Sequence, residues 1–127
     1  MVAISADGAL LGSLSQAASS SWPLVQCDNT GAALRALATG NPRLVVIDDD
    51  ALAPGFCNCV IAGARQFTPA AKIIYVTGRH TSWREAEVRQ AGVHFYAAKP
   101  VDEELLGRVA RTLIKDDARR AAAVYQV

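Results

Sequence analysis

Short apolar runs alternate with stretches of helical periodicity along this chain. Five runs predict buried strands, at residues 2–5, 24–27, 44–47, 72–76 and 93–97. Between them, and after the last, apolar residues recur every three or four positions, which predicts helices over 9–18, 32–39, 55–67, 82–92 and from 103 onward. Near-continuous apolar runs are typical of parallel strands that are covered on both faces. The pattern therefore indicates an α/β protein.

Right-handed crossovers between such strands place helices on both faces of the sheet. We therefore expect a flavodoxin-like, doubly wound three-layer sandwich, whose five parallel strands follow the order 2-1-3-4-5. No G-x-G-x-x-G follows the first strand, so a dinucleotide-binding Rossmann domain is disfavoured. The 127 residues are expected to form a single domain, in which 118–127 are a helical tail or the start of a linker.

Several polar residues mark where the predicted helices begin. Asp28 or Thr30 is expected to cap the second helix, and Asp102 the last. Ser82 and Glu85 have the spacing of a capping box at the start of the fourth helix. The apolar stripe of the third helix is predicted to consist of Phe56, Val60, Ala64 and Phe67.

Three of the apolar runs lead into side chains that bind anions or phosphoryl groups. The run 44–47 is followed by Asp48, the run 73–76 by Thr77, and the run 94–98 by Lys99 and Pro100. The carboxyl ends of parallel strands meet at one edge of a sheet, where ligands bind. A carboxylate, a hydroxyl and an ammonium, distant in sequence, should therefore meet in a site for a phosphoryl group or in the remnant of one.

Composition narrows the remaining classes. The net charge is +1 and only 20% of residues are charged, so no nucleic-acid partner is indicated. No apolar run is long enough to cross a membrane and no signal peptide is evident, so we expect a cytoplasmic protein. Cys27, Cys57 and Cys59 lack the spacing of a disulfide framework, and Cys57 and Cys59 are interpreted as ordinary helix residues.

The sequence resembles the receiver domains of two-component response regulators. The resemblance extends over nearly the whole chain and is strongest from residue 42 to 114, where the segments 42–48, 72–78 and 91–100 carry it. It implies that a histidine kinase transfers a phosphoryl group to Asp48, that Thr77 and Lys99 contact this group, and that Tyr96 is the switch aromatic, which swings inward when the hydroxyl moves. Gly78, directly after Thr77, is small as in the family, which leaves room for a phosphoryl group to enter.

The resemblance also implies a signalling module rather than an enzyme. In the family, the face formed by the fourth helix, fifth strand and fifth helix carries the output. Here this face is expected to bind a signalling partner or a second copy of the chain. The C-terminal residues are interpreted either as a helical tail or as the start of a linker to an output domain.

The chain departs from the family after the first strand, where receivers have two adjacent acids that hold a divalent metal. Here Ser5 and Ala6 occupy those positions, unless a shift of one residue lets Asp7 serve as the second acid. Asp48 remains, and Asp50 can supply a side chain or a backbone carbonyl. Mg²⁺ binds through one or two carboxylates plus waters and phosphate, so with a donor missing we expect weak Mg²⁺ binding.

Three functions follow from these features. The favoured one is a receiver-like domain with a degenerate metal site that acts through protein–protein contacts, with weak or absent phosphorylation. The second is a working phosphoacceptor in a phosphorelay, with Asp48 as acceptor and Asp7 as the lone upstream acid. The third is a small flavodoxin-like enzyme or ligand-binding domain that uses the same crevice. It is disfavoured because no phosphate-binding glycine loop or nucleophile elbow is present.

Overall fold

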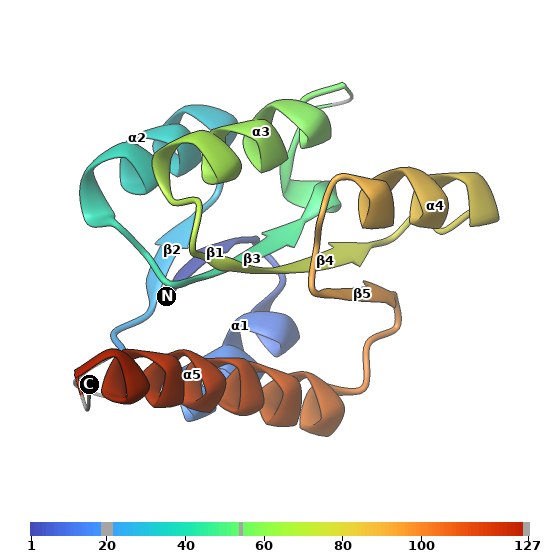
Figure 1. Cartoon of the computed structure of the whole chain (residues 1–127). Coiled ribbons are helices and arrows are strands. Elements are labelled where there is room, and N and C mark those ends of the chain that lie inside the picture. The colour runs from blue at the N-terminus through green and yellow to red at the C-terminus, as the bar shows by residue number, and fades with distance from the viewer. Residues whose placement is uncertain (19–21, 54, 126–127) are drawn as a thin grey trace.

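A parallel five-stranded sheet forms the centre of the computed structural model (Figure 1). The structure describes residues 1–18, 22–53 and 55–125, with side chains as far as Lys115. The strands are β1 (Val2–Ile4), β2 (Val25–Cys27), β3 (Leu44–Asp48), β4 (Lys72–Thr77) and β5 (Phe95–Ala98), and their order is β2-β1-β3-β4-β5. The predicted fold class and strand order are confirmed.

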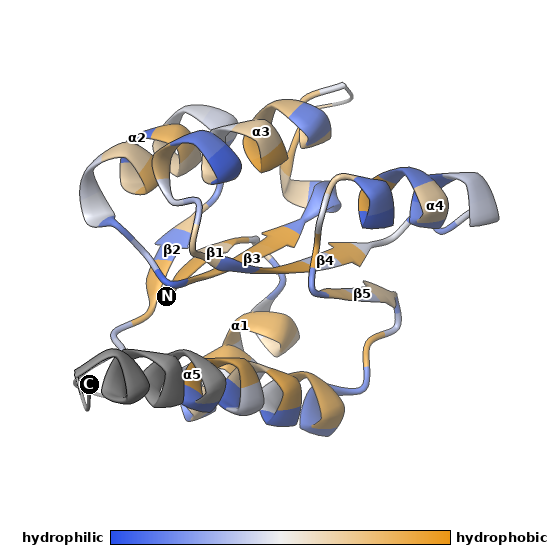
Figure 2. Cartoon of the chain, in the orientation of Figure 1, coloured by the Kyte–Doolittle hydropathy of each residue, from blue (hydrophilic) through white to orange (hydrophobic). Residues whose placement is uncertain are grey.

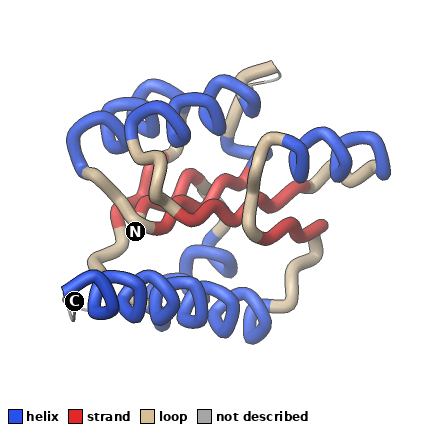
Figure 3. The backbone as a smooth tube through the Cα atoms, in the orientation of Figure 1, coloured by secondary structure: helices blue, strands red, loops and turns tan. Residues whose placement is uncertain are grey.

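Helices cover both faces of the sheet (Figure 3). They are α1 (Gly8–Ala17), α2 (Thr30–Gly40), α3 (Cys57–Phe67), α4 (Ser82–Gln90) and α5 (Glu103–Tyr125), and a short 3₁₀ helix, η1 (Asp49–Ala51), follows β3. On one face, α2, α3 and α4 pack against the sheet, and on the other α1 and α5 do so (Figure 1). The predicted tail lies in α5 as far as Tyr125, and residues 126–127 lie outside the described part of the chain.

The two hydrophobic cores result from the alternation of side chains along the strands. Val45 and Ile47 of β3 point into the core beneath α2 and α3, whereas Leu44 and Val46 point into the core beneath α1 and α5. All residues of β3 are buried, so this strand is apolar on both faces until Asp48 (Figure 2). Asp48 therefore lies at the carboxyl end of the central strand of the sheet.

Two of the predicted helix caps are wrong. The side chain of Asn29, not of Asp28 or Thr30, caps α2 by accepting a hydrogen bond from the backbone N–H of Ala32. Thr81 caps α4, one residue before the predicted Ser82. Adjacent polar residues compete for the cap, and the one whose backbone is extended at the helix entry takes it, as Asn29 and Thr81 do.

The other helix predictions have mixed outcomes. Asp102 caps α5 by accepting from the N–H of Leu105, as predicted. In α3, however, Phe56 precedes the helix and Phe67 ends it, and both rings are exposed. The buried stripe of α3 instead consists of Val60, Ile61, Gly63 and Ala64. Within the described residues, no helix combines the length and the apolar character needed to cross a membrane.

Candidate functional site

The structure brings Asp48, Thr77 and Lys99 to the carboxyl edge of the sheet. Asp48 ends β3, Thr77 ends β4, and Lys99 directly follows β5. The Nζ of Lys99 lies 3.0 Å from Oδ2 of Asp48, and the backbone N–H of Lys99 donates to the carbonyl of Thr77 at 2.8 Å. Asp48 and Thr77 are buried, while Lys99 is partly exposed. The sequence therefore located correctly the residues that meet at this edge.

Lys99 is the centre of a cluster of three carboxylates. Its Nζ lies 3.0 Å from Oδ2 of Asp48, 3.0 Å from Oδ2 of Asp50 and 3.3 Å from Oδ2 of Asp7. Partial burial alone lowers the pKa of Lys99, but the hydrogen bonds to Asp48 and Asp50 outweigh it and raise the pKa above its ordinary value. An ammonium has three N–H donors, so Lys99 has one for each carboxylate.

Ser5 completes the surroundings of Asp48. Its hydroxyl donates to Oδ2 of Asp48 at 2.7 Å, and it accepts the backbone N–H of Asp7 at 3.0 Å. The other Asp48 oxygen, Oδ1, accepts the N–H of Asp50 at 3.1 Å. Both carboxylate oxygens of Asp48 therefore accept hydrogen bonds, and one of the donors is the Ser5 hydroxyl. From the sequence, Ser5 indicates only a missing acid, and this hydrogen bond is not predicted.

Asp7 has a structural role that the sequence analysis missed. Its Oδ1 accepts the backbone N–H groups of Ala9 and Leu10, which makes it the N-cap of α1. The bond from Leu10 lowers the pKa of Asp7, partial burial opposes the shift, and Lys99 adds to the lowering. Asp7 therefore remains ionised and links the start of α1 to Lys99. An aspartate two residues before the predicted helix was the available signal for this cap, and α1 begins one residue earlier than predicted, at Gly8.

Thr77 and Tyr96 are held by neighbours other than Asp48. The Thr77 hydroxyl accepts the backbone N–H of Arg79 at 3.0 Å. Tyr96 is buried, its ring stacks on that of Tyr75 with 6.0 Å between centroids, and its hydroxyl lies 2.9 Å from Nδ1 of His80. The aromatic residue that the family resemblance assigns to the switch therefore lies in a buried position in this structure.

A second, separate network surrounds Asp49. Its Oδ2 accepts from the hydroxyl of Tyr75 at 3.1 Å and pairs with Nη1 of Arg84 at 3.3 Å, while Oδ1 accepts the N–H of Gly78 at 3.3 Å. Burial raises the pKa of Tyr75, so its hydroxyl stays protonated and donates. Strand alternation points Asp49 away from Asp48, and its buried carboxylate contacts β4 and α4 rather than solvent.

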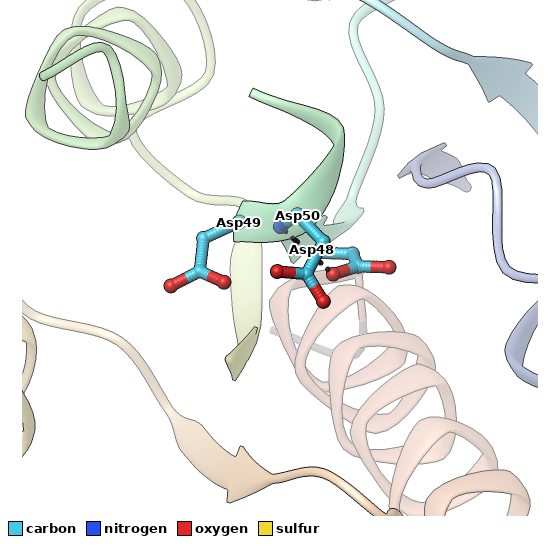
Figure 4. Close-up of side chains that lie close together, drawn as sticks. All are labelled: Asp48, Asp49 and Asp50. Atoms are coloured by element: carbon cyan, nitrogen blue, oxygen red, sulfur yellow. Dashed lines mark hydrogen bonds between the residues drawn. The ribbon is translucent and has the colours of Figure 1, made fainter. Parts of the chain in front are cut away.

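Figure 4 shows how the acidic run is divided between these two networks. The side chains of Asp48 and Asp50 point to the same side, whereas Asp49 points away from them (Figure 4). The carboxylates of all three lie close enough to share an ion, with ligand atoms within 4.8 Å of one another. Carboxylate oxygens are the donors that Mg²⁺ prefers. Asp48 and Asp50 offer such oxygens, whereas Asp49 already bonds to Tyr75, Arg84 and Gly78. Asp7 lies outside this group of three and contacts Lys99 at 3.3 Å.

Solved structures that match this fold include receiver domains of response regulators. The signal receiver domain of a putative Luxo repressor protein from Vibrio parahaemolyticus is 14% identical, with a TM-score of 0.80 over 96% of this chain and 94% of that one. A CheY-like receiver domain protein from Methanospirillum hungatei is 22% identical, with a TM-score of 0.74 over 93% and 95% of the two chains. By sequence, no family model and no curated protein matches the chain.

One structural neighbour was solved in a phosphorylated form. It is a response regulator from Burkholderia pseudomallei with a phosphorylated aspartic acid, a calcium ion and citrate. It is 20% identical, and the match has a TM-score of 0.69 over 96% of this chain and 72% of that one. Together these likenesses show that the chain has the receiver fold of response regulators.

Proposed function

We propose that this chain is a receiver-type signalling domain, not an enzyme, that acts through protein–protein contacts with weak or absent phosphorylation of Asp48. The observation that carries the proposal is the cluster at the carboxyl edge of a receiver fold. Asp48, Thr77 and Lys99 lie at this edge. Ser5, which the resemblance aligns with one of the two acids of receivers, donates to the Asp48 oxygen that also binds Lys99. The phosphoryl-contacting residues would be Thr77 and Lys99.

Phosphorylation of Asp48 is disfavoured by the charges already at the site. A phosphoryl group brings a charge of about −1.5 to −2 to a carboxylate. Asp7 and Asp50 already compete with Asp48 for Lys99. A divalent cation would neutralise this charge and orient the phosphoryl oxygens, and it would be held by Asp48 with Asp7 or Asp50. Without the second upstream acid, we infer that the cation binds weakly.

The surface of α4 supports a role in protein contacts. Trp83, in the first turn of α4, is 80% exposed. Tryptophan is among the residue types that most often dominate binding energy at interfaces. The partner would be a histidine kinase or another signalling protein, and a homodimer through α4, β5 and α5 stays a prediction.

A phosphodonor experiment separates this proposal from the second candidate, a working phosphoacceptor. The second candidate is favoured by the close approach of Lys99 to Asp48 and by the phosphorylated aspartic acid of the Burkholderia regulator. The chain is incubated with acetyl phosphate and Mg²⁺, and its intact mass is measured. We expect only a small fraction of the chain, or none, to gain the mass of one phosphoryl group. Asp48→Asn gives the background, and extensive labelling of the unmodified chain above that background would establish the phosphoacceptor instead.

Restoring the missing acids is expected to strengthen Mg²⁺ binding. In Ser5→Asp combined with Ala6→Asp, one carboxylate replaces the hydroxyl that contacts Asp48 and a second is added at the exposed position 6. The added charge raises the electrostatic attraction for a divalent cation. Titration calorimetry with MgCl₂ is expected to show a lower dissociation constant, by about tenfold or more, the change that corresponds to about 1.4 kcal/mol. Asp28→Asn, at an exposed acid after β2, is the charge control. Tight Mg²⁺ binding by the unmodified chain would contradict the expectation.

A further inference from the structure

The carboxylate of Asp50 occupies the space above Gly78. A Cβ built on Gly78 would lie 2.5 Å from Oδ2 and 2.9 Å from Oδ1 of Asp50, closer than non-bonded atoms approach. Gly78 does not have the positive φ that favours glycine, so its backbone itself would accept alanine. The lack of a side chain at position 78 therefore makes room, and Asp50 fills that room.

The same carboxylate takes one of the contacts of Lys99. Its Oδ2 lies 3.0 Å from Nζ, as close as Oδ2 of Asp48. The backbone N–H of Asp50 also donates to Oδ1 of Asp48, so the two acids are held side by side. Two neighbouring carboxylates repel each other, and the ammonium of Lys99, which contacts both, offsets this repulsion. Asp50 is thus an anion adjacent to Asp48, bound to the ammonium and lying over the small residue that follows β4.

We propose that the Asp50 carboxylate is a built-in occupant of the place that a phosphoryl group on Asp48 would take. The inference rests on the proposed function, because it takes Asp48 as the position of the acceptor. A phosphoryl group would have to displace Asp50 from Lys99 and from the space above Gly78, against the repulsion between the two anions. The chain carries its own substitute for the phosphoryl group and so obstructs phosphorylation.

A consequence is that the loop after β4 is held without any phosphoryl group. The carboxylate of Asp50 fills the space that a side chain at Gly78 would take, and the N–H of Gly78 donates to Oδ1 of Asp49. Arg84, at the start of α4, is tied to the same Asp49. Two consecutive acids of η1 therefore fix the connection that leads from the site to α4, the helix that carries the exposed Trp83.

The first test measures access to Asp48. Unmodified chain, Asp50→Ala and the charge control Asp28→Ala are incubated with acetyl phosphate and Mg²⁺. In the labelling step an Asp48 oxygen bonds to phosphorus while the bond from phosphorus to the acetyl oxygen breaks and acetate leaves. The MgCl₂ concentration is raised until labelling no longer depends on it, so that loss of the Asp50 carboxylate as a possible metal ligand does not limit the reaction. Under these conditions we expect Asp50→Ala to gain mass about tenfold faster than the other two, the ratio that corresponds to about 1.4 kcal/mol. Labelling of Asp50→Ala no faster than Asp28→Ala would overturn the proposal.

The second test needs neither metal nor phosphodonor. Gly78→Ala is introduced into the unmodified chain and into Asp50→Ala, and the thermal midpoint is measured for all four proteins. The added methyl group meets the Asp50 carboxylate only when that carboxylate is present, so the midpoint should fall in the first background and change little in the second. An equal fall in both backgrounds would overturn the placement of Asp50.

The two tests keep this inference apart from the proposed function. Rapid labelling of the unmodified chain would refute weak phosphorylation, whereas the Gly78→Ala comparison would still decide whether Asp50 fills the space. Conversely, an equal effect of Gly78→Ala in both backgrounds would remove Asp50 as the obstacle. The missing acid at position 5, where Ser5 stands, would then remain as the explanation of weak phosphorylation.

Discussion

Lys99→Ala is expected to lower the free energy of unfolding by about 3 kcal/mol. This is the low end of the cost of removing one partner from a buried ion pair, because Asp48 is buried whereas Lys99 is partly exposed. Lys99 is the shared counter-charge of Asp7, Asp48 and Asp50. Without it, the buried carboxylate of Asp48 retains only Ser5 and a backbone N–H as donors, beside two other anions. Urea denaturation monitored by circular dichroism would measure the loss.

Asp48→Asn is the matched comparison for this prediction. It removes one charge of the cluster but keeps a carbonyl oxygen that can accept from Lys99 and Ser5, so it should cost less than Lys99→Ala. Mg²⁺ should also raise the urea midpoint of unfolding more in Lys99→Ala than in the unmodified chain. The reason is that the cation can replace the lost ammonium among the three carboxylates. A cost of Asp48→Asn equal to or greater than that of Lys99→Ala would contradict the electrostatic explanation.

The sequence was sufficient for the fold and for the residues at the sheet edge. Parallel strands covered on both faces need uninterrupted apolar runs, and the run that ends at Asp48 is such a case. Once the strands are placed, topology alone brings Asp48, Thr77 and Lys99 to one edge, because all parallel strands end there. No knowledge of side-chain packing was needed for that step.

Contacts that depend on the details of the backbone were not predictable in the same way. Asp28, Asn29 and Thr30 are all acceptable caps by residue type, and only the extended backbone of Asn29 decides between them. The position of Asp50 over Gly78 depends on the turn of η1, whose three residues leave no periodic pattern. Alternation gave the direction of Asp49 but not its partners, since Arg84 lies 35 residues away on a helix whose rotation the sequence does not specify.

Asp49→Ala is expected to lower the free energy of unfolding by about 3 kcal/mol, because several polar groups lose their hydrogen-bond or ion-pair partner at once. The hydroxyl of the fully buried Tyr75 loses its acceptor, Arg84 loses its counter-ion and the N–H of Gly78 loses its carboxylate. Each buried group left without a partner costs about 1–3 kcal/mol, less where water can reach it, as at Arg84. Chemical denaturation measures the total.

Tyr75→Phe provides the control that assigns this loss to the network. It removes the Tyr75 hydroxyl, which loses its acceptor in Asp49→Ala, and keeps the ring that stacks on Tyr96. In the Tyr75→Phe background, Asp49→Ala should therefore cost less than in the unmodified chain, by about 1 kcal/mol. Hydrogen exchange at the start of α4 should rise in Asp49→Ala, since Arg84 ties that turn to Asp49. If Asp49→Ala changes stability by no more than about 0.5 kcal/mol, as an ordinary surface substitution does, the acid does not hold α4 to the sheet.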